Sequence, residues 1–121
     1  MPMLKRAPDA PAEALALSAS GAVTAQEVEA AIGAALGEAA TGLVIVIEPD
    51  FDGDFAELAR GLASAALAHR ALVKLAVVVD PDEMDGPRLN SFEASPVPIR
   101  QFARADMNSA LEWAAAARRG E

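Results

Sequence analysis

Short apolar runs separated by polar turns form the pattern of this chain. Two of the runs, at 43–47 and 75–79, are unbroken and rich in β-branched residues, which is typical of strands buried on both faces of a parallel sheet. The run at 97–102 alternates between apolar and polar residues, and Pro98 within it has no N–H to donate, so this strand is expected at a sheet edge. The predicted strands are 3–6, 14–19, 43–48, 72–79 and 97–102.

Apolar residues at helical spacing follow three of these strands. Thr24 and Glu27 form a capping box, in which the Thr24 hydroxyl accepts the Glu27 N–H and the Glu27 carboxylate accepts the Thr24 N–H. The capping box predicts a helix over about 25–40. Asp54 and Asp106 are expected to cap two further helices, because Asp is favoured at the residue that precedes a helix.

The predicted strands and helices alternate along the chain. Such alternation is typical of α/β proteins with a mainly parallel sheet and right-handed crossovers. We therefore expect an α/β fold with a four to five stranded, mainly parallel sheet and helical crossovers. Residues 1–121 are expected to form a single domain, in which 1–13 is a short extended N-terminal segment. Gly86 and Pro87 leave room for only a short helix near 88–93.

Several runs of residues carry a family resemblance through their order and spacing. They are Ser-Gly-Ala-Val-Thr-Ala-Gln-Glu at 20–27, Asp-Phe-Asp-Gly at 50–53, Lys-Leu-Ala-Val-Val-Val-Asp at 74–80, and Ile-Arg-Gln-Phe at 99–102 with Ala-Leu-Glu-Trp at 110–113. Together they resemble the SpoIIAA-like group of STAS domains (sulfate transporter and anti-sigma factor antagonist). The resemblance covers most of the chain and implies a STAS-type α/β fold.

The resemblance also implies a function in binding. Anti-sigma antagonists of this family are protein-binding switches, controlled by phosphorylation of a Ser at the start of the helix after the second parallel strand. This chain has no Ser or Thr between Thr41 and Ser64, so we expect no such phosphorylation. It also departs from the family at 81–95, where a Trp-containing helix is usual. Lipid-binding relatives of the fold imply an apolar pocket as an alternative.

Charge and residue types exclude several classes of protein. With 10 Lys and Arg against 18 Asp and Glu, the net charge is -8, which excludes nucleic acid as a partner because such binding depends on clustered basic residues. The chain has no Cys and one His, which excludes a disulfide scaffold and a Cys-based zinc site. No apolar stretch approaches the ~20 residues of a transmembrane segment, and we expect a cytoplasmic protein.

Acidic residues concentrate where two predicted parallel strands end. Nine of the 18 lie at 48–57 or 80–85. Open α/β sheets bind ligands at the carboxyl ends of their strands, so we expect a basic or apolar-basic partner here, although helix capping and turns also account for these residues. Phe51 is interpreted as an exposed apolar contact. The predicted binding residues are Asp50, Phe51, Asp52, Gly53, Asp54, Asp80, Asp82 and Glu83.

Known metal and catalytic motifs do not fit the chain. The Asp-x-Asp-x-Asp pattern at 50–54 begins like a calcium loop, but Phe55 stands where Gly is required and Gly61 where Glu is required. We therefore expect no metal and no cofactor. His69 is expected on the apolar face of the last turn of its helix, bonding to terminal carbonyls, with no nucleophile or acid assembled around it.

The sequence thus predicts a non-enzymatic STAS-like binding or regulatory domain, whose partner is another protein or a second copy of itself in a homodimer. The alternative is a small carrier or sensor of an apolar or amphipathic, lipid-like ligand, which requires a connected apolar cavity of ~300 Å³ or more. An enzyme is a third hypothesis, for which the sequence assembles no catalytic set.

Overall fold

Strands and helices alternate along the chain in the computed structural model, which describes residues 4–6, 14–19, 24–35, 41–48, 51, 55–80 and 97–116. The strands are β1 (Leu4–Arg6), β2 (Ala14–Ala19), β3 (Thr41–Ile47), β4 (Leu72–Val79) and β5 (Ile99–Ala103). The helices are α1 (Ala25–Ala35), α2 (Phe55–Ala68) and α3 (Met107–Ala115), and a 3-10 turn, η3 (Arg104–Asp106), leads directly into α3. None of the helices in these described ranges has the length and apolar character needed to cross a membrane.

The five strands form one sheet, in which the spatial order β1-β2-β3-β4-β5 is also the order along the chain. Strands β2 to β5 run parallel to one another, and β1 is antiparallel to β2. The predicted α/β class with a mainly parallel sheet is therefore confirmed, whereas the STAS-specific fold stays a prediction. Among the described strands β5 lies at the edge of the sheet, as expected, but it begins at Ile99, after Pro98, and not at residue 97. The Pro98 carbonyl accepts the Leu75 N–H at 2.9 Å.

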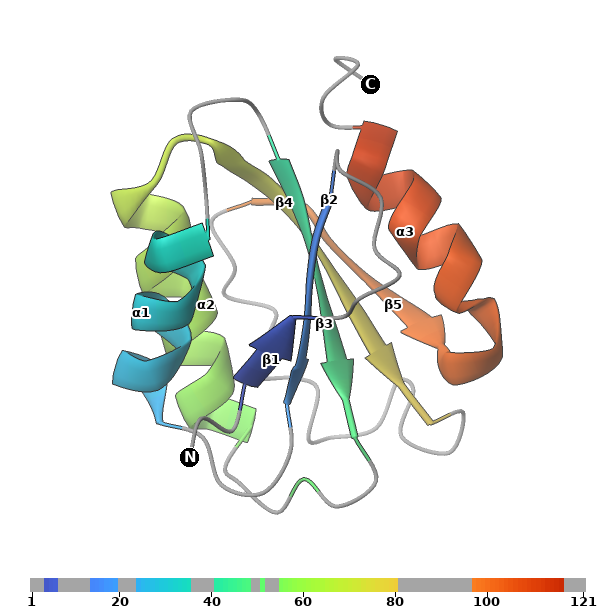
Figure 1. Ribbon diagram of the computed structural model, residues 1–121, viewed down its shortest axis with the longest axis horizontal. Coiled ribbons are helices and arrows are strands. Elements are labelled where there is room, and N and C mark those ends of the chain that lie inside the picture. Colours follow the sequence, from blue (N-terminus) through green and yellow to red (C-terminus); the bar gives the residue numbers. More distant parts are fainter. Residues whose placement is uncertain are drawn as a thin grey trace.

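Helices α1 and α2 cover one face of the sheet, and α3 covers the other (Figure 1). Successive side chains of a strand point to opposite faces, so the paired Leu43 and Leu75 pack toward α1 and α2, and the paired Val44 and Ala76 pack toward α3. Every residue of β3 is buried. Burial on both faces explains why the central strands are continuous apolar runs in the sequence.

Two glycines bring the helices close to their neighbours. A Cβ added to Gly61 of α2 would lie 2.6 Å from Val28 Cβ and 2.7 Å from the Ala25 carbonyl oxygen, both on α1. A Cβ added to Gly42 of β3 would lie 2.6 Å from the Ala114 Cα on α3. Either added Cβ would overlap the neighbouring helix, so both packing contacts depend on glycine, which has no Cβ.

The boundaries of some elements differ from the prediction. β3 begins at Thr41, before the apolar run, because the Thr41 N–H donates to the Ala71 carbonyl at 2.6 Å. The expectation that the Asp106 side chain caps α3 is wrong: it makes no cap hydrogen bond. Asp106 closes the η3 turn, so it lacks the extended backbone of a capping residue. The helical segments predicted at 36–40 and 88–93 lie outside the described residues.

Candidate functional site

The carboxyl ends of β3, β4 and β5 meet at one edge of the sheet, where Arg104 joins them. Arg104 directly follows β5, and its Nε donates to Oδ1 of Asp80, after β4, at 3.0 Å. Its Nη1 lies 3.8 Å from Oε2 of Glu48, which follows β3. Its Nη2 donates to the backbone carbonyl of Ile47. One guanidinium therefore binds the ends of two neighbouring strands, and we call Glu48, Asp80 and Arg104 the Arg104 cluster.

The side chains of the Arg104 cluster are reachable from solvent, with exposed fractions of 34% for Arg104, 35% for Glu48 and 43% for Asp80. Solvent partly screens ion pairs at this depth. Arg104 is not among the predicted site residues, although its place directly after a predicted strand indicates this position. Parallel strands end at the same edge, so a cation directly after β5 lies near the acids that follow β3 and β4.

Phe51 is buried, so its interpretation as an exposed contact is wrong. Its exposed fraction is 8%, and it belongs to the core cluster between the sheet and helices α1 and α2. The Phe51 N–H donates to the Glu48 carbonyl at 3.0 Å. Phe51 is therefore joined to the residue that follows β3, and its ring lies in the core although its neighbours in the sequence are acidic.

Of the other predicted binding residues, the structure describes only Asp80. Asp80 lies at the expected edge and is bound by Arg104. Within the described part of the chain, no group of three or more acidic or histidine side chains could hold a metal ion. The residues that lie outside the described ranges are Asp50, Asp52, Gly53, Asp54, Asp82 and Glu83.

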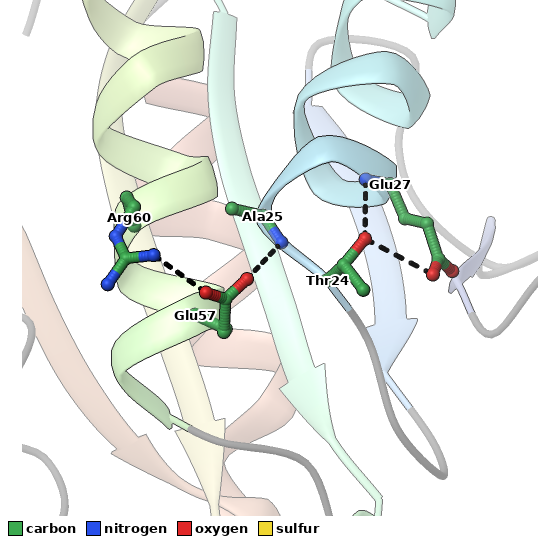
Figure 2. Close-up of polar contacts among 5 residues, drawn as sticks. All are labelled: Thr24, Ala25, Glu27, Glu57 and Arg60. Atoms are coloured by element: carbon green, nitrogen blue, oxygen red, sulfur yellow. Dashed lines mark hydrogen bonds and ion pairs between the residues drawn. The ribbon is translucent and has the colours of Figure 1, made fainter.

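Glu57 links the N-terminal ends of α1 and α2 (Figure 2). Its Oε2 accepts the backbone N–H of Ala25 at 2.9 Å, and its Oε1 accepts Nη1 of Arg60 at 2.6 Å. Half of the predicted capping box is present, because the Thr24 hydroxyl accepts the Glu27 N–H at 3.2 Å. The other half differs from the prediction. The Glu27 carboxylate accepts a hydrogen bond from the Thr24 hydroxyl, at 3.2 Å, and not from the Thr24 backbone N–H. Side chains therefore satisfy N–H groups at the start of α1.

His69 is the first residue after α2. Its imidazole was expected to bond a carbonyl at the end of the helix. Instead, its backbone N–H donates to such a carbonyl, that of Ala65, at 2.9 Å. The imidazole lies against α1, where a Cβ added to Gly33 would be 3.2 Å from Nε2. With Gln26, Glu29 and Ala30, His69 lines an open depression of about 370 Å³. This depression is open to solvent, and three of its four lining residues are polar, whereas a lipid carrier requires an enclosed apolar cavity.

Comparisons of the chain with protein-family models, curated proteins and solved structures find no match. The α/β class therefore rests on the strand order and the burial pattern described above. The resemblance to STAS domains stays a prediction from the sequence.

Proposed function

We propose that the chain is a non-enzymatic binding or regulatory domain of the STAS type, which binds a protein partner at the carboxyl edge of its sheet. The observation that carries the proposal is the Arg104 cluster. It anchors the residues at the ends of β3 and β4, directly before the acidic segments 50–54 and 82–85. Because the residue before each acidic segment is already held, a partner that binds the segment has less conformational entropy to remove.

The charge of this edge favours a basic partner. Arg104 compensates part of the charge of Glu48 and Asp80. Immediately beyond them the sequence places three Asp at 50–54 and three acids at 82–85. Like charges crowded together destabilise a fold by self-repulsion, so positive charge brought by a partner would stabilise it. A protein segment with Lys or Arg beside apolar side chains has the matching chemistry.

Close packing of the described core supports binding over transport of an apolar ligand. Val28 and Ile32 of α1 and Leu58 and Leu62 of α2 are at most 1% exposed. They fill the space between these helices and the sheet, so an apolar ligand would have to displace them. On the other face, Gly42 brings α3 into direct contact with β3. We therefore retain the binding function over the carrier alternative.

Regulation by the family's phosphorylation switch does not fit this edge. The residues between Thr41 and Ser64 offer no hydroxyl group, and carboxylates occupy the segment that would be modified. These carboxylates supply negative charge without any phosphorylation. Binding would then depend on partner concentration and salt, and a second copy of the chain is one of the partners to test by light scattering.

A titration of the isotope-labelled protein with a basic peptide tests the proposal. The probe is an acetylated, amidated peptide of alternating Lys and Leu, and its neutral match alternates Gln and Leu. We expect saturable shifts of the Glu48 and Asp80 amide signals with the basic peptide, weakened by salt. The double variant Asp52→Asn with Asp82→Asn should weaken binding about tenfold, as expected for the loss of two exposed charge pairs.

A matched control separates this site from general charge attraction. Glu29→Gln with Glu112→Gln removes the same charge from exposed positions on α1 and α3, and should leave the affinity unchanged. Equal binding of the neutral peptide, or an equal loss in both double variants, would show that the carboxyl edge is not the binding site.

A further inference from the structure

Helix α3 runs alongside β5 (Figure 1). Cations and aromatic rings of β4, β5 and α3 form a row here. The Arg100 guanidinium carbon is 5.0 Å from the centroid of the Phe102 ring. The Phe102 and Trp113 ring centroids are 6.0 Å apart, with an interplanar angle of 53°. Nζ of Lys74 lies 4.5 Å from the centroid of the Trp113 ring. We call these four residues the cation–aromatic row.

The members of the row differ in exposure. Phe102 and Lys74 are buried, at 6% and 8% exposed. Arg100 is exposed and Trp113 is partly exposed. The two buried residues therefore support the two that reach solvent: Phe102 stacks under the guanidinium, and Lys74 lies over one side of the indole. Both cation–ring distances are within the ~6 Å over which a ring attracts a cation.

Arg100 differs from Arg60 and Arg104 in its polar contacts. Arg60 binds Glu57, and Arg104 binds Asp80 and Glu48. Among the described residues, no carboxylate lies within ion-pair distance of the Arg100 guanidinium. Stacking on Phe102 orders the planar fork of donors and leaves it directed to solvent.

We propose that Arg100 and Trp113 form a second binding surface, which takes an acidic peptide segment of a partner protein. An ordered guanidinium fork matches a carboxylate through two parallel hydrogen bonds. The partly exposed indole offers an apolar face for the side chain next to that carboxylate. Lys74 adds positive potential beside the indole. Arg and Trp are also the residue types that contribute most to the affinity of protein interfaces.

This surface is separate from the carboxyl edge and has the opposite charge preference. The carboxyl edge carries acids and favours a basic partner, whereas Arg100 and Trp113 favour an acidic one. The inference does not rest on the proposed function, because none of its residues belongs to the Arg104 cluster. Two different segments can therefore bind the domain at the same time.

Trp113 is the only Trp in a chain without Tyr, so its fluorescence reports binding at this surface directly. The probe is an acetylated, amidated peptide of alternating Glu and Leu, with the Gln and Leu peptide as its neutral match. We expect a saturable change in Trp113 emission with the acidic peptide only. Arg100→Gln should weaken this binding about tenfold, the loss of one charge-assisted pair. Arg100→Lys should weaken it less, since it keeps the charge and loses the fork.

Arg70→Gln is the matched control, because Arg70 is an exposed arginine outside the row. It should bind the acidic peptide like the wild type. An equal loss in Arg70→Gln, or equal binding of the neutral peptide, would overturn the proposal. A change of emission with anionic lipid vesicles but not with the acidic peptide would overturn it in favour of a membrane surface. Asp52→Asn with Asp82→Asn should leave this titration unchanged, so that failure of either proposal is distinguishable from failure of the other.

Discussion

Replacing Gly42 by alanine tests the close contact between β3 and α3. The added methyl carbon would lie 2.6 Å from the Ala114 Cα and 2.8 Å from its carbonyl carbon, where ordinary contact begins at 3.4 Å. These atoms belong to the backbone of α3, so no side-chain rotation can relieve the overlap. The end of α3 must therefore move away from the sheet by about 1 Å.

The expected cost follows from two opposing effects. Overpacking of a core contact costs about 1–3 kcal/mol, and the smaller entropy of the unfolded chain with Ala offsets about 0.4–1 kcal/mol. We expect a net loss of about 1–2 kcal/mol in the free energy of unfolding. For a domain of this size the Tm should fall by roughly 3–8 °C. Trp113 is next to Ala114 in the chain, so the same movement should change its emission in the folded protein.

Urea unfolding followed by Trp113 emission and by circular dichroism measures both effects. Gly33→Ala is the matched control, because the new methyl would meet only the His69 ring, at 3.2 Å from Nε2. That ring can turn toward solvent, and Ala is favoured over Gly in a helix by up to ~1 kcal/mol. Gly33→Ala should be at least as stable as the wild type. If Gly42→Ala proves equally stable, the reasoning from the β3–α3 contact is refuted.

Three further variants test the core and the polar contacts. Phe51→Ala should lower the free energy of unfolding by about 3 kcal/mol, as for a buried Phe; a loss below about 1 kcal/mol would instead match an exposed ring. Arg104→Gln should lower the free energy of unfolding by about 1 kcal/mol at low salt and by less at high salt. Adding Asp80→Asn should lower it little further, because the pair is already broken. Additive losses in this double-mutant cycle would contradict the pairing of Arg104 with Asp80. Glu57→Ala leaves the Ala25 N–H without its side-chain acceptor and should cost about 1 kcal/mol in thermal unfolding; an unchanged Tm would mean that Glu57 does not stabilise α1.

Sequence pattern predicts the sheet well because its strands are buried in a simple way. The central strands have helices on both faces, so burial leaves unbroken apolar runs at β3 and β4. Pro98, directly before β5, indicates the edge position because a residue without an N–H is disfavoured in a central strand. Boundaries are less predictable, since they depend on single contacts such as the hydrogen bond from Thr41 to Ala71.

The sequence predicts where the candidate site lies, but not which side chains contact one another there. The end of β4 at Asp80 follows from the hydrophobic pattern, and Asp80 lies at the predicted edge. The pairing of Asp80 with Arg104 depends on which strands are neighbours, and no local pattern in the sequence encodes that order. The interpretation of Phe51 as exposed is wrong because it rests on the acidic neighbours in the sequence, whereas the ring is buried in the core and the Phe51 N–H bonds the Glu48 carbonyl.

Among the described residues, α3 alone packs on the second face of the sheet. Its nine residues cover Val44, Val46, Ala76 and Val78, and an opening of α3 would break far fewer contacts than unfolding the sheet. Amides in α3 should therefore exchange with deuterium through a local opening, well before those of β3. Each such opening uncovers a contiguous apolar surface, of the kind through which proteins aggregate. The docking of one short helix thus determines how often a sheet that is itself intact becomes prone to aggregation.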